Sequence, residues 1–196
     1  MSTRTVELHP YSTKLQEYFD FNNRTVMGTS IRPIFEVHNA GMPGERALDQ
    51  MLPRLNQILR QAPTRLQYSW VIILGGTNDL RKYGKNISLS DSIFHALVEL
   101  HNITHTFGAR SVAVSIPDRG CEGSGTCSYL KETHHKINEL LRNFTTHNKE
   151  KVIIADLANA VSLPRDKKLW SDSLHFTQQG YEKMANVIYN SMKEHV

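Results

Sequence analysis

The feature that most constrains the fold is an apolar run at residues 71–74 that ends on two glycines. Val-Ile-Ile-Leu has no polar side chain, and such a run bounded by glycine is typical of a strand buried on both faces of a parallel sheet. Gly75-Gly76 lets the backbone turn sharply without clashes of a Cβ atom. Thr77-Asn78-Asp79 is therefore expected at the carboxyl edge of a central strand, where open α/β sheets bind their ligands.

Strand and helix patterns alternate along the rest of the chain. We expect strands at 31–38, 70–74, 111–116 and 151–157, and helices at 6–22, 45–61, 88–107, 129–147 and 177–194, with loops at 118–127 and 158–173. Alternation of this kind predicts right-handed crossovers and a parallel sheet covered by helices on both faces. The fold class is therefore α/β, as one three-layer α/β/α domain over residues 1–196. Pro53 predicts a kink in the second helix or its division into two short helices.

The composition excludes several classes of protein. The chain has 196 residues and a net charge of +4, but its lysines and arginines are scattered, which does not favour nucleic-acid binding. No apolar run approaches the ~20 residues of a membrane span. The first residues contain no apolar signal segment, so we expect a cytoplasmic protein. Asn23, Asn86, Asn102 and Asn143 begin glycosylation sequons that we expect to be unused.

Cys121 and Cys127 are the two cysteines of the chain. They flank a flexible loop, Glu-Gly-Ser-Gly-Thr, that would allow a disulfide to close. In a cytosolic protein, two free thiols are the favoured interpretation.

Asp172 and His175 form the first candidate catalytic pair, because they lie three residues apart at the start of the last helix. The carboxylate would accept a hydrogen bond from one imidazole nitrogen and leave the other nitrogen free as a general base. The alternative is a loop aspartate that caps the following helix.

Gly41 and Asn78 are candidate oxyanion donors, since a glycine N–H and an asparagine amide both follow predicted strands. The alternative is that Gly41 shapes a turn and Asn78 caps a helix. His101 and His105 have the i, i+4 spacing of a metal-binding pair, but no further ligand is apparent. We therefore expect a solvated helix face there and a surface position for His134-His135, with no metal and no cofactor.

Taken in order, these motifs resemble the SGNH (GDSL-type) hydrolase family of esterases and lipases. Asn39-Ala-Gly41-Met-Pro-Gly-Glu45 is similar to the family's second block, Gly75-Gly-Thr-Asn78-Asp79 to its third, and Trp170-Ser-Asp172-Ser-Leu-His175 with the residues up to Tyr181 to its last. His9-Pro10-Tyr11 and Met51-Leu-Pro-Arg-Leu55 also look familial. The resemblance covers roughly residues 8–192.

The resemblance implies a flavodoxin-like parallel sheet and hydrolysis of a carboxylic ester by Ser-His-Asp chemistry. In that reading His175 is the base, Asp172 orients it, and Gly41 and Asn78 hold the oxyanion. The implied substrate is a small ester: a lysophospholipid, a short-chain ester or an acetylated sugar.

The sequence departs from the family at its first block, a Gly-Asp-Ser motif that follows the first central strand. That motif does not occur, no such strand is visible before the first helix, and Ser2 is a weak candidate for the nucleophile. Ser12 is expected as a surface or cap residue of the first helix. Catalysis is therefore uncertain from the sequence, and a non-catalytic binding or regulatory protein on the same scaffold is the alternative.

Overall fold

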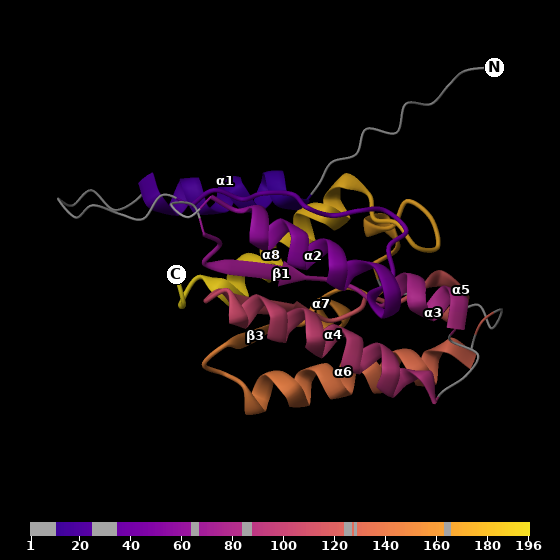
Figure 1. Cartoon of the computed structure of the whole chain (residues 1–196). Coiled ribbons are helices and arrows are strands. Elements are labelled where there is room, and N and C mark those ends of the chain that lie inside the picture. The colour runs from indigo at the N-terminus through magenta and orange to yellow at the C-terminus, as the bar shows by residue number, and fades with distance from the viewer. Residues whose placement is uncertain are drawn as a thin grey trace, which may run out of the picture.

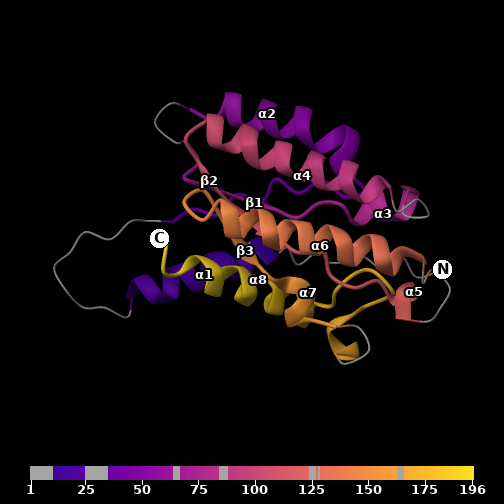
Figure 2. The same cartoon turned by 90° about the horizontal axis from the view of Figure 1, so that it is seen from below.

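The computed structural model describes residues 11–24, 35–63, 67–83, 88–123, 127, 129–162 and 166–196. Within them, helices cover both faces of a central parallel sheet (Figures 1 and 2). The predicted α/β class is thus confirmed. Ser2, residues 4–8 and residues 31–34 lie outside the described residues.

The sheet consists, within the described residues, of β1 (Trp70–Ile73), β2 (Arg110–Val114) and β3 (Val152–Ala155), in the order β1-β2-β3. Both pairings are parallel, with Val71 opposite Ser111 and Val112 opposite Ile153. The sheet edges at the carboxyl ends of these strands all point toward the same end of the molecule, as parallel pairing requires.

The strand predicted at 31–38 is not formed in its described part, 35–38. Gln16 explains the difference, because its side chain supplies the backbone partners that a ladder would supply. Its Nε2 donates to the carbonyl of Phe35 at 2.9 Å, and its Oε1 accepts from the N–H of Val37 at 2.7 Å. The segment is therefore fixed to a helix rather than to the sheet.

One face of the sheet is covered by α1 (Tyr11–Arg24) and α8 (Gln178–Met192), with the short α7 (Leu157–Ala160) beside them. Their core includes Leu15, Val112, Ala155 and Ile188, all essentially inaccessible to solvent. Ser12, expected at the surface, is buried in the first turn of α1.

The other face is covered by α2 (Leu52–Gln61), α4 (Leu89–Thr106) and α6 (Tyr129–His147). A π-helical turn, η1 (Ala47–Met51), precedes α2, so the predicted disturbance near Pro53 takes the form of a change in helix type just before the proline. Ile73, Leu97 and Ile137 contribute to the core on this face.

Short helices occupy the connections at the carboxyl edge. They are α3 (Thr77–Tyr83) after β1, α5 (Gly120–Gly123) after β2, and the 3₁₀ turn η2 (Lys167–Leu169) before the last helix. The predicted loops at 118–127 and 158–173 therefore contain ordered turns. No described helix is long and apolar enough to cross a membrane.

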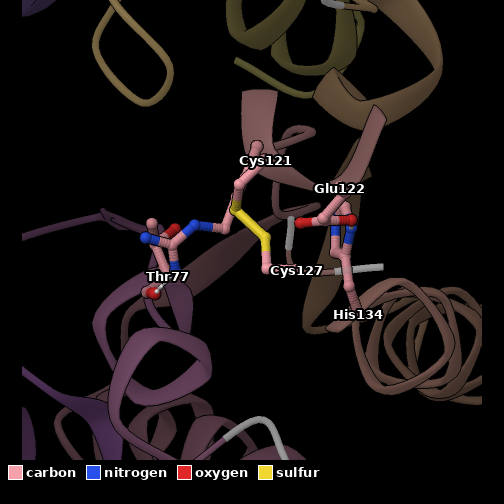
Figure 3. Close-up of a disulfide and its surroundings, with 6 residues drawn as sticks. Thr77, Cys121, Glu122, Cys127 and His134 are labelled. Carbon is pink, nitrogen blue, oxygen red and sulfur yellow. Dashed lines mark hydrogen bonds and ion pairs between the residues drawn. A yellow bond between two sulfur atoms is a disulfide. The ribbon is translucent and has the colours of Figure 1, made fainter. Parts of the chain in front are cut away.

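Cys121 and Cys127 form a disulfide, so the expectation of free thiols is wrong (Figure 3). The local backbone favours the pairing, because the N–H of Cys127 donates to the carbonyl of Cys121 at 3.0 Å. This turn brings the two side chains together at the start of α6.

His101 and His134, which were expected in solvent, are buried, whereas His105 is half-buried and His135 is exposed as predicted. His101 is 1% exposed, and its Nδ1 lies 2.8 Å from the Ser111 hydroxyl, which also lies 3.0 Å from His105 Nε2. Burial, followed by the charge of His105, lowers the pKa of His101 to about 3, so its ring is neutral. The pair therefore joins α4 to β2, and no cluster of three metal-ligating residues occurs in the described part of the chain.

Candidate active site

Asp172 and His175 are paired in the structure. Asp172 Oδ2 lies 2.8 Å from His175 Nδ1, while its Oδ1 accepts the backbone N–H groups of Leu174 and His175, each at 2.7 Å. The carboxylate is held from three directions and therefore presents a fixed acceptor to the ring. This favours the tautomer with the proton on Nδ1 and leaves Nε2 as the basic nitrogen. No described residue makes a hydrogen bond to Nε2.

The pair is exposed, but the loop that carries it is anchored. The side chain of His175 is 65% exposed and that of Asp172 is 54% exposed. Below them, Trp170 and Phe176 form a β-bridge, are both buried, and pack with ring centroids 4.3 Å apart. The N–H of Ser171 also donates to the carbonyl of His175 at 2.8 Å. The exposed Asp172–His175 pair is thus carried by a loop that buried aromatic side chains anchor to the core.

Gly180 explains how this loop can lie against α8. A Cβ at this position would stand 2.2 Å from the carbonyl oxygen of Leu169 and 2.7 Å from Phe176 Cβ. Only a glycine therefore permits the close approach. The N–H of Gly180 is accepted by the Thr177 side chain, which caps α8. The alternative in which Asp172 caps that helix is therefore wrong.

The electrostatics of the loop favour an ionised Asp172. Partial burial acts to raise its pKa, but the hydrogen bonds from His175 and Leu174 outweigh it and leave the pKa below its ordinary value. Burial, with the nearby charge of Asp172, raises the pKa of Tyr181. Asp172 is therefore a carboxylate at neutral pH.

Asn78 and the loop before η1 form the second half of the site. Asn78 lies in the first turn of α3, and its Nδ2 donates to the carbonyl of Glu45 at 2.9 Å. An amide nitrogen carries two hydrogens, so one remains for another acceptor. The N–H of Gly41 donates to Asn39 Oδ1 at 3.0 Å, which makes a local turn.

A half-buried ion pair holds the loop that precedes η1 in place. Arg54 forms a bidentate ion pair with Glu45 and donates to the carbonyl of Ala40 at 2.6 Å. The hydrogen bond to Glu45 raises the pKa of Arg54 despite partial burial. These contacts therefore fix the orientation of the Glu45 carbonyl that accepts from Asn78.

Asp79, expected at the open edge, is instead fully buried. Its carboxylate accepts the N–H groups of Ala47 at 2.9 Å and Leu48 at 3.0 Å, and so satisfies the start of η1. Asp79 is a structural residue, and only its neighbour Asn78 remains a candidate donor.

Gly76 makes the sharp turn between β1 and α3. Its φ is +95°, and a Cβ would lie 2.6 Å from Ile116 Cδ1. The predicted role of the glycine pair is thereby confirmed, and the turn fixes where Asn78 begins its helix.

The two halves are joined by the residues that precede and begin α5. Arg119 Nη1 donates to the carbonyl of Thr77 at 2.9 Å, and the N–H of Gly120 donates to the carbonyl of Ser173 at 2.7 Å. Thr77 precedes Asn78, and Ser173 lies between Asp172 and His175. A single dipeptide therefore contacts both halves.

A comparison with protein families identifies the family to which this arrangement belongs. The family model described as "GDSL-like Lipase/Acylhydrolase family" matches residues 15–183. The chain belongs to the GDSL-like lipase/acylhydrolase family. A comparison with curated protein sequences found no match.

Solved structures share the fold of this family member. A lipolytic protein of the G-D-S-L family from Veillonella parvula DSM 2008 has a TM-score of 0.65 at 14% identity, covering 97% of this chain and 93% of that one. The esterase EstA from Pseudoalteromonas sp. has a TM-score of 0.62 at 17% identity, covering 94% and 86%. The acetyl xylan esterase AlAXEase has a TM-score of 0.64 at 16% identity, covering 92% and 89%.

Within this GDSL-like domain, the predicted residues fall into two groups. Asp172 and His175 contact each other directly, and Asn78 and Gly41 lie on the loops of the other half. Ser2 lies outside the described residues. The predicted contact between Asp172 and His175 is therefore present, while the roles of Asn78, Gly41 and the nucleophile stay predictions.

The sequence did not reveal Arg119, Glu122, His134 and Asn138, which together fix the connection after β2. Asn138 Oδ1 accepts from the N–H of Ile116 at 2.8 Å, and its Nδ2 donates to the Ile116 carbonyl at 2.9 Å. The four-residue spacing of His134 and Asn138 on one face of α6 is the signal that would have suggested a shared target.

A cavity of about 300 Å³ lies between α6 and the connections after β2 and β3. Asp118, Glu139 and Asn159 are among its lining residues. None of Asp172, His175, Asn78 and Gly41 lines it, so it is separate from the candidate active site.

Proposed function

We propose that this chain is a carboxylic-ester hydrolase in which His175 is the general base and Asp172 its orienting carboxylate. The observation that carries the proposal is the fixed geometry of Asp172, which holds the proton of the ring on Nδ1. Nε2 then has the lone pair needed to take a proton from a hydroxyl nucleophile and return it to the leaving alcohol.

Asn78 is proposed to stabilise the oxyanion of the tetrahedral intermediate. One of its amide hydrogens is engaged by Glu45, which orients the group, and the second is available for the developing negative charge. Gly41 is proposed as a further donor, which requires its N–H to leave Asn39 Oδ1. No nucleophile is assigned among the described residues, and Ser2, which lies outside them, is a weak candidate.

The proposed substrate is a small ester: an acetylated sugar, a short-chain ester or a lysophospholipid. The fold shared with an acetyl xylan esterase makes acetylated sugars a natural first test. Hydrolysis by this route requires no metal or cofactor.

One observation favours a different function, a non-catalytic binding protein. The N–H of Gly41 and one hydrogen of Asn78 are both engaged within the chain. Of the two proposed donors, the second hydrogen of Asn78 is then the one left for a bound carbonyl, which would hold a ligand but stabilise an oxyanion less than a full set of donors.

Hydrolysis of a nitrophenyl acetate by the 196-residue chain separates the two functions. We expect turnover that His175→Ala reduces by about 10⁶-fold, because removal of a triad base leaves only the residual catalysis of binding and oxyanion stabilisation. His95→Ala, which removes an exposed histidine on α4, is the matched control. Equal turnover in both variants would contradict the hydrolase proposal, and turnover that survives Ser2→Ala would assign the nucleophile elsewhere.

A further inference from the structure

The segment Arg119-Gly120 contacts both halves of the candidate site. The disulfide and the ion pair beside it have no role in the proposed hydrolysis. The two contacts of the segment are to the carbonyls of Thr77 and Ser173. Any change in its position would therefore move the strand-β1 turn and the His175 loop relative to each other.

The disulfide closes directly behind this segment. Cys121 follows Gly120, and its partner Cys127 lies just before α6, where the N–H of Leu130 donates to the carbonyl of Cys127 at 2.9 Å. The bond thus joins α5 covalently to the turn just before α6 (Figure 3).

A buried ion pair makes a second connection between the same two helices. His134 is 1% exposed, and its Nδ1 lies 2.9 Å from Glu122 Oε2 (Figure 3). Its Nε2 lies 2.6 Å from the carbonyl of Ile116, at the end of the β2 connection. Asn138 Nδ2 also lies 3.0 Å from Nε2, so the ring contacts α5, the residues after β2 and its own helix at once.

The surroundings of His134 act on its pKa in opposite directions. Burial acts to lower the pKa of His134, but the hydrogen bond and the charge of Glu122 outweigh it and leave the pKa raised. A buried charge without its partner is costly, so Glu122 and His134 hold each other in place.

We propose that the Cys121–Cys127 disulfide and the Glu122–His134 pair form a clamp that positions Gly120 and Arg119, and through them the His175 loop against the Asn78 turn. The clamp residues are positioning residues: none of them contacts Asp172, His175 or Asn78 among the interactions of the described residues. The expected effect of the clamp on turnover rests on the proposed function. Its expected effect on the position of Gly120 does not.

Amide hydrogen exchange tests the structural consequence in the intact ¹⁵N-labelled chain. Reduction of the disulfide by a phosphine, verified by mass, is expected to raise the exchange rate of the Gly120 N–H at least tenfold and to shift the Asn78 side-chain amide resonances. The amides of β2 serve as the check that the chain stays folded. Unchanged Gly120 exchange in the reduced, folded chain would overturn the clamp.

Two variants separate positioning from general destabilisation. Cys121→Ser with Cys127→Ser should reproduce the reduced state, and Ile137→Val, which trims a buried residue of α6 outside the clamp, is the matched control. Faster Gly120 exchange in both variants alike would overturn the proposal, because α6 packing alone would then explain it.

Steady-state turnover of the ester measures how the clamp affects catalysis. We expect kcat for the nitrophenyl ester to fall by about tenfold to a hundredfold in the double serine variant, with little change in KM, because misplacement of reacting groups affects the chemical step. Unchanged kcat beside faster exchange would overturn the positioning role. A wild-type chain without turnover contradicts the hydrolase function instead, and the exchange experiment still decides the clamp.

Discussion

The two halves of the candidate site are built in opposite ways. The Asn78 half is set into the core: Asp79 is completely buried beneath it, and Gly76 packs against Ile116. The Asp172–His175 half is a surface loop whose polar contacts are made largely within residues 171–175.

This difference predicts how each half responds to substitution. Buried polar groups with several partners contribute to folding, and their loss leaves unsatisfied donors. Exposed groups with local partners contribute little to stability. Changes in the His175 loop should therefore alter chemistry alone, whereas changes around Asn78 should alter folding as well.

The strongest test of this contrast is Asp172→Asn. The amide keeps an oxygen for the two backbone N–H groups but places an NH₂ group against His175 Nδ1, which forces the wrong tautomer. We expect turnover to fall by about 10⁴-fold. The melting temperature at pH 7 should stay within about 1 °C of wild type, because the side chain is largely exposed. A large loss of stability would break the contrast.

Asn78→Ala is expected to have the next largest effect on turnover. Loss of one oxyanion donor typically lowers kcat by about 10²–10³-fold. Unlike Asp172→Asn, this variant also releases the Glu45 carbonyl, so a stability loss of about 1 kcal/mol should accompany it. Steady-state kinetics and urea unfolding measure the two effects, and a change in KM without a change in kcat would argue against the oxyanion role.

Gly76→Ala should destabilise the fold by about 3 kcal/mol, since strain at positive φ adds to overpacking against Ile116. Gly108→Ala is the matched control: its φ is +80°, but nothing lies within 4 Å of the added Cβ. Its expected cost is about 1 kcal/mol, from backbone strain alone. Equal losses in urea unfolding would mean that the contact with Ile116 is not important.

Asp79→Asn should cost about 2 kcal/mol, because the amide cannot accept both N–H groups of η1 with charge assistance. Asp91→Asn, which removes an exposed ion pair with Lys136, should change stability by less than about 0.5 kcal/mol. Similar midpoints of unfolding for the two variants would contradict the anchoring role of Asp79.

The smallest expected effect is a pH dependence of stability from Asp172. Its pKa in the folded chain is depressed below the ordinary 3.8. The associated stabilisation is therefore present above pH 4 and is lost as the pH falls through the depressed value. Melting temperatures from pH 6 to pH 2.5 should decline slightly more steeply in wild type than in Asp172→Asn; parallel curves would show that the pair adds nothing to stability.

Several parts of this protein followed from the sequence alone. The apolar run before Gly75 predicted β1, the alternating patterns predicted the parallel α/β fold, and the order of the motifs identified Asp172, His175, Gly41 and Asn78 as site candidates. The predictions of the strand and of the fold class succeeded because periodicity and glycine placement are local properties of the chain, whereas the catalytic roles of the four site candidates stay predictions.

The tertiary structure decided what depends on distant partners. Gln16 satisfies the backbone of 35–37 and so replaces a predicted strand, and His134, expected at the surface, is buried against Glu122. The pairing of Cys121 with Cys127 likewise depends on the turn at the start of α6. A sequence shows which groups are present, but burial and hydrogen-bond partners arise only when the elements pack, and these set charge state and position.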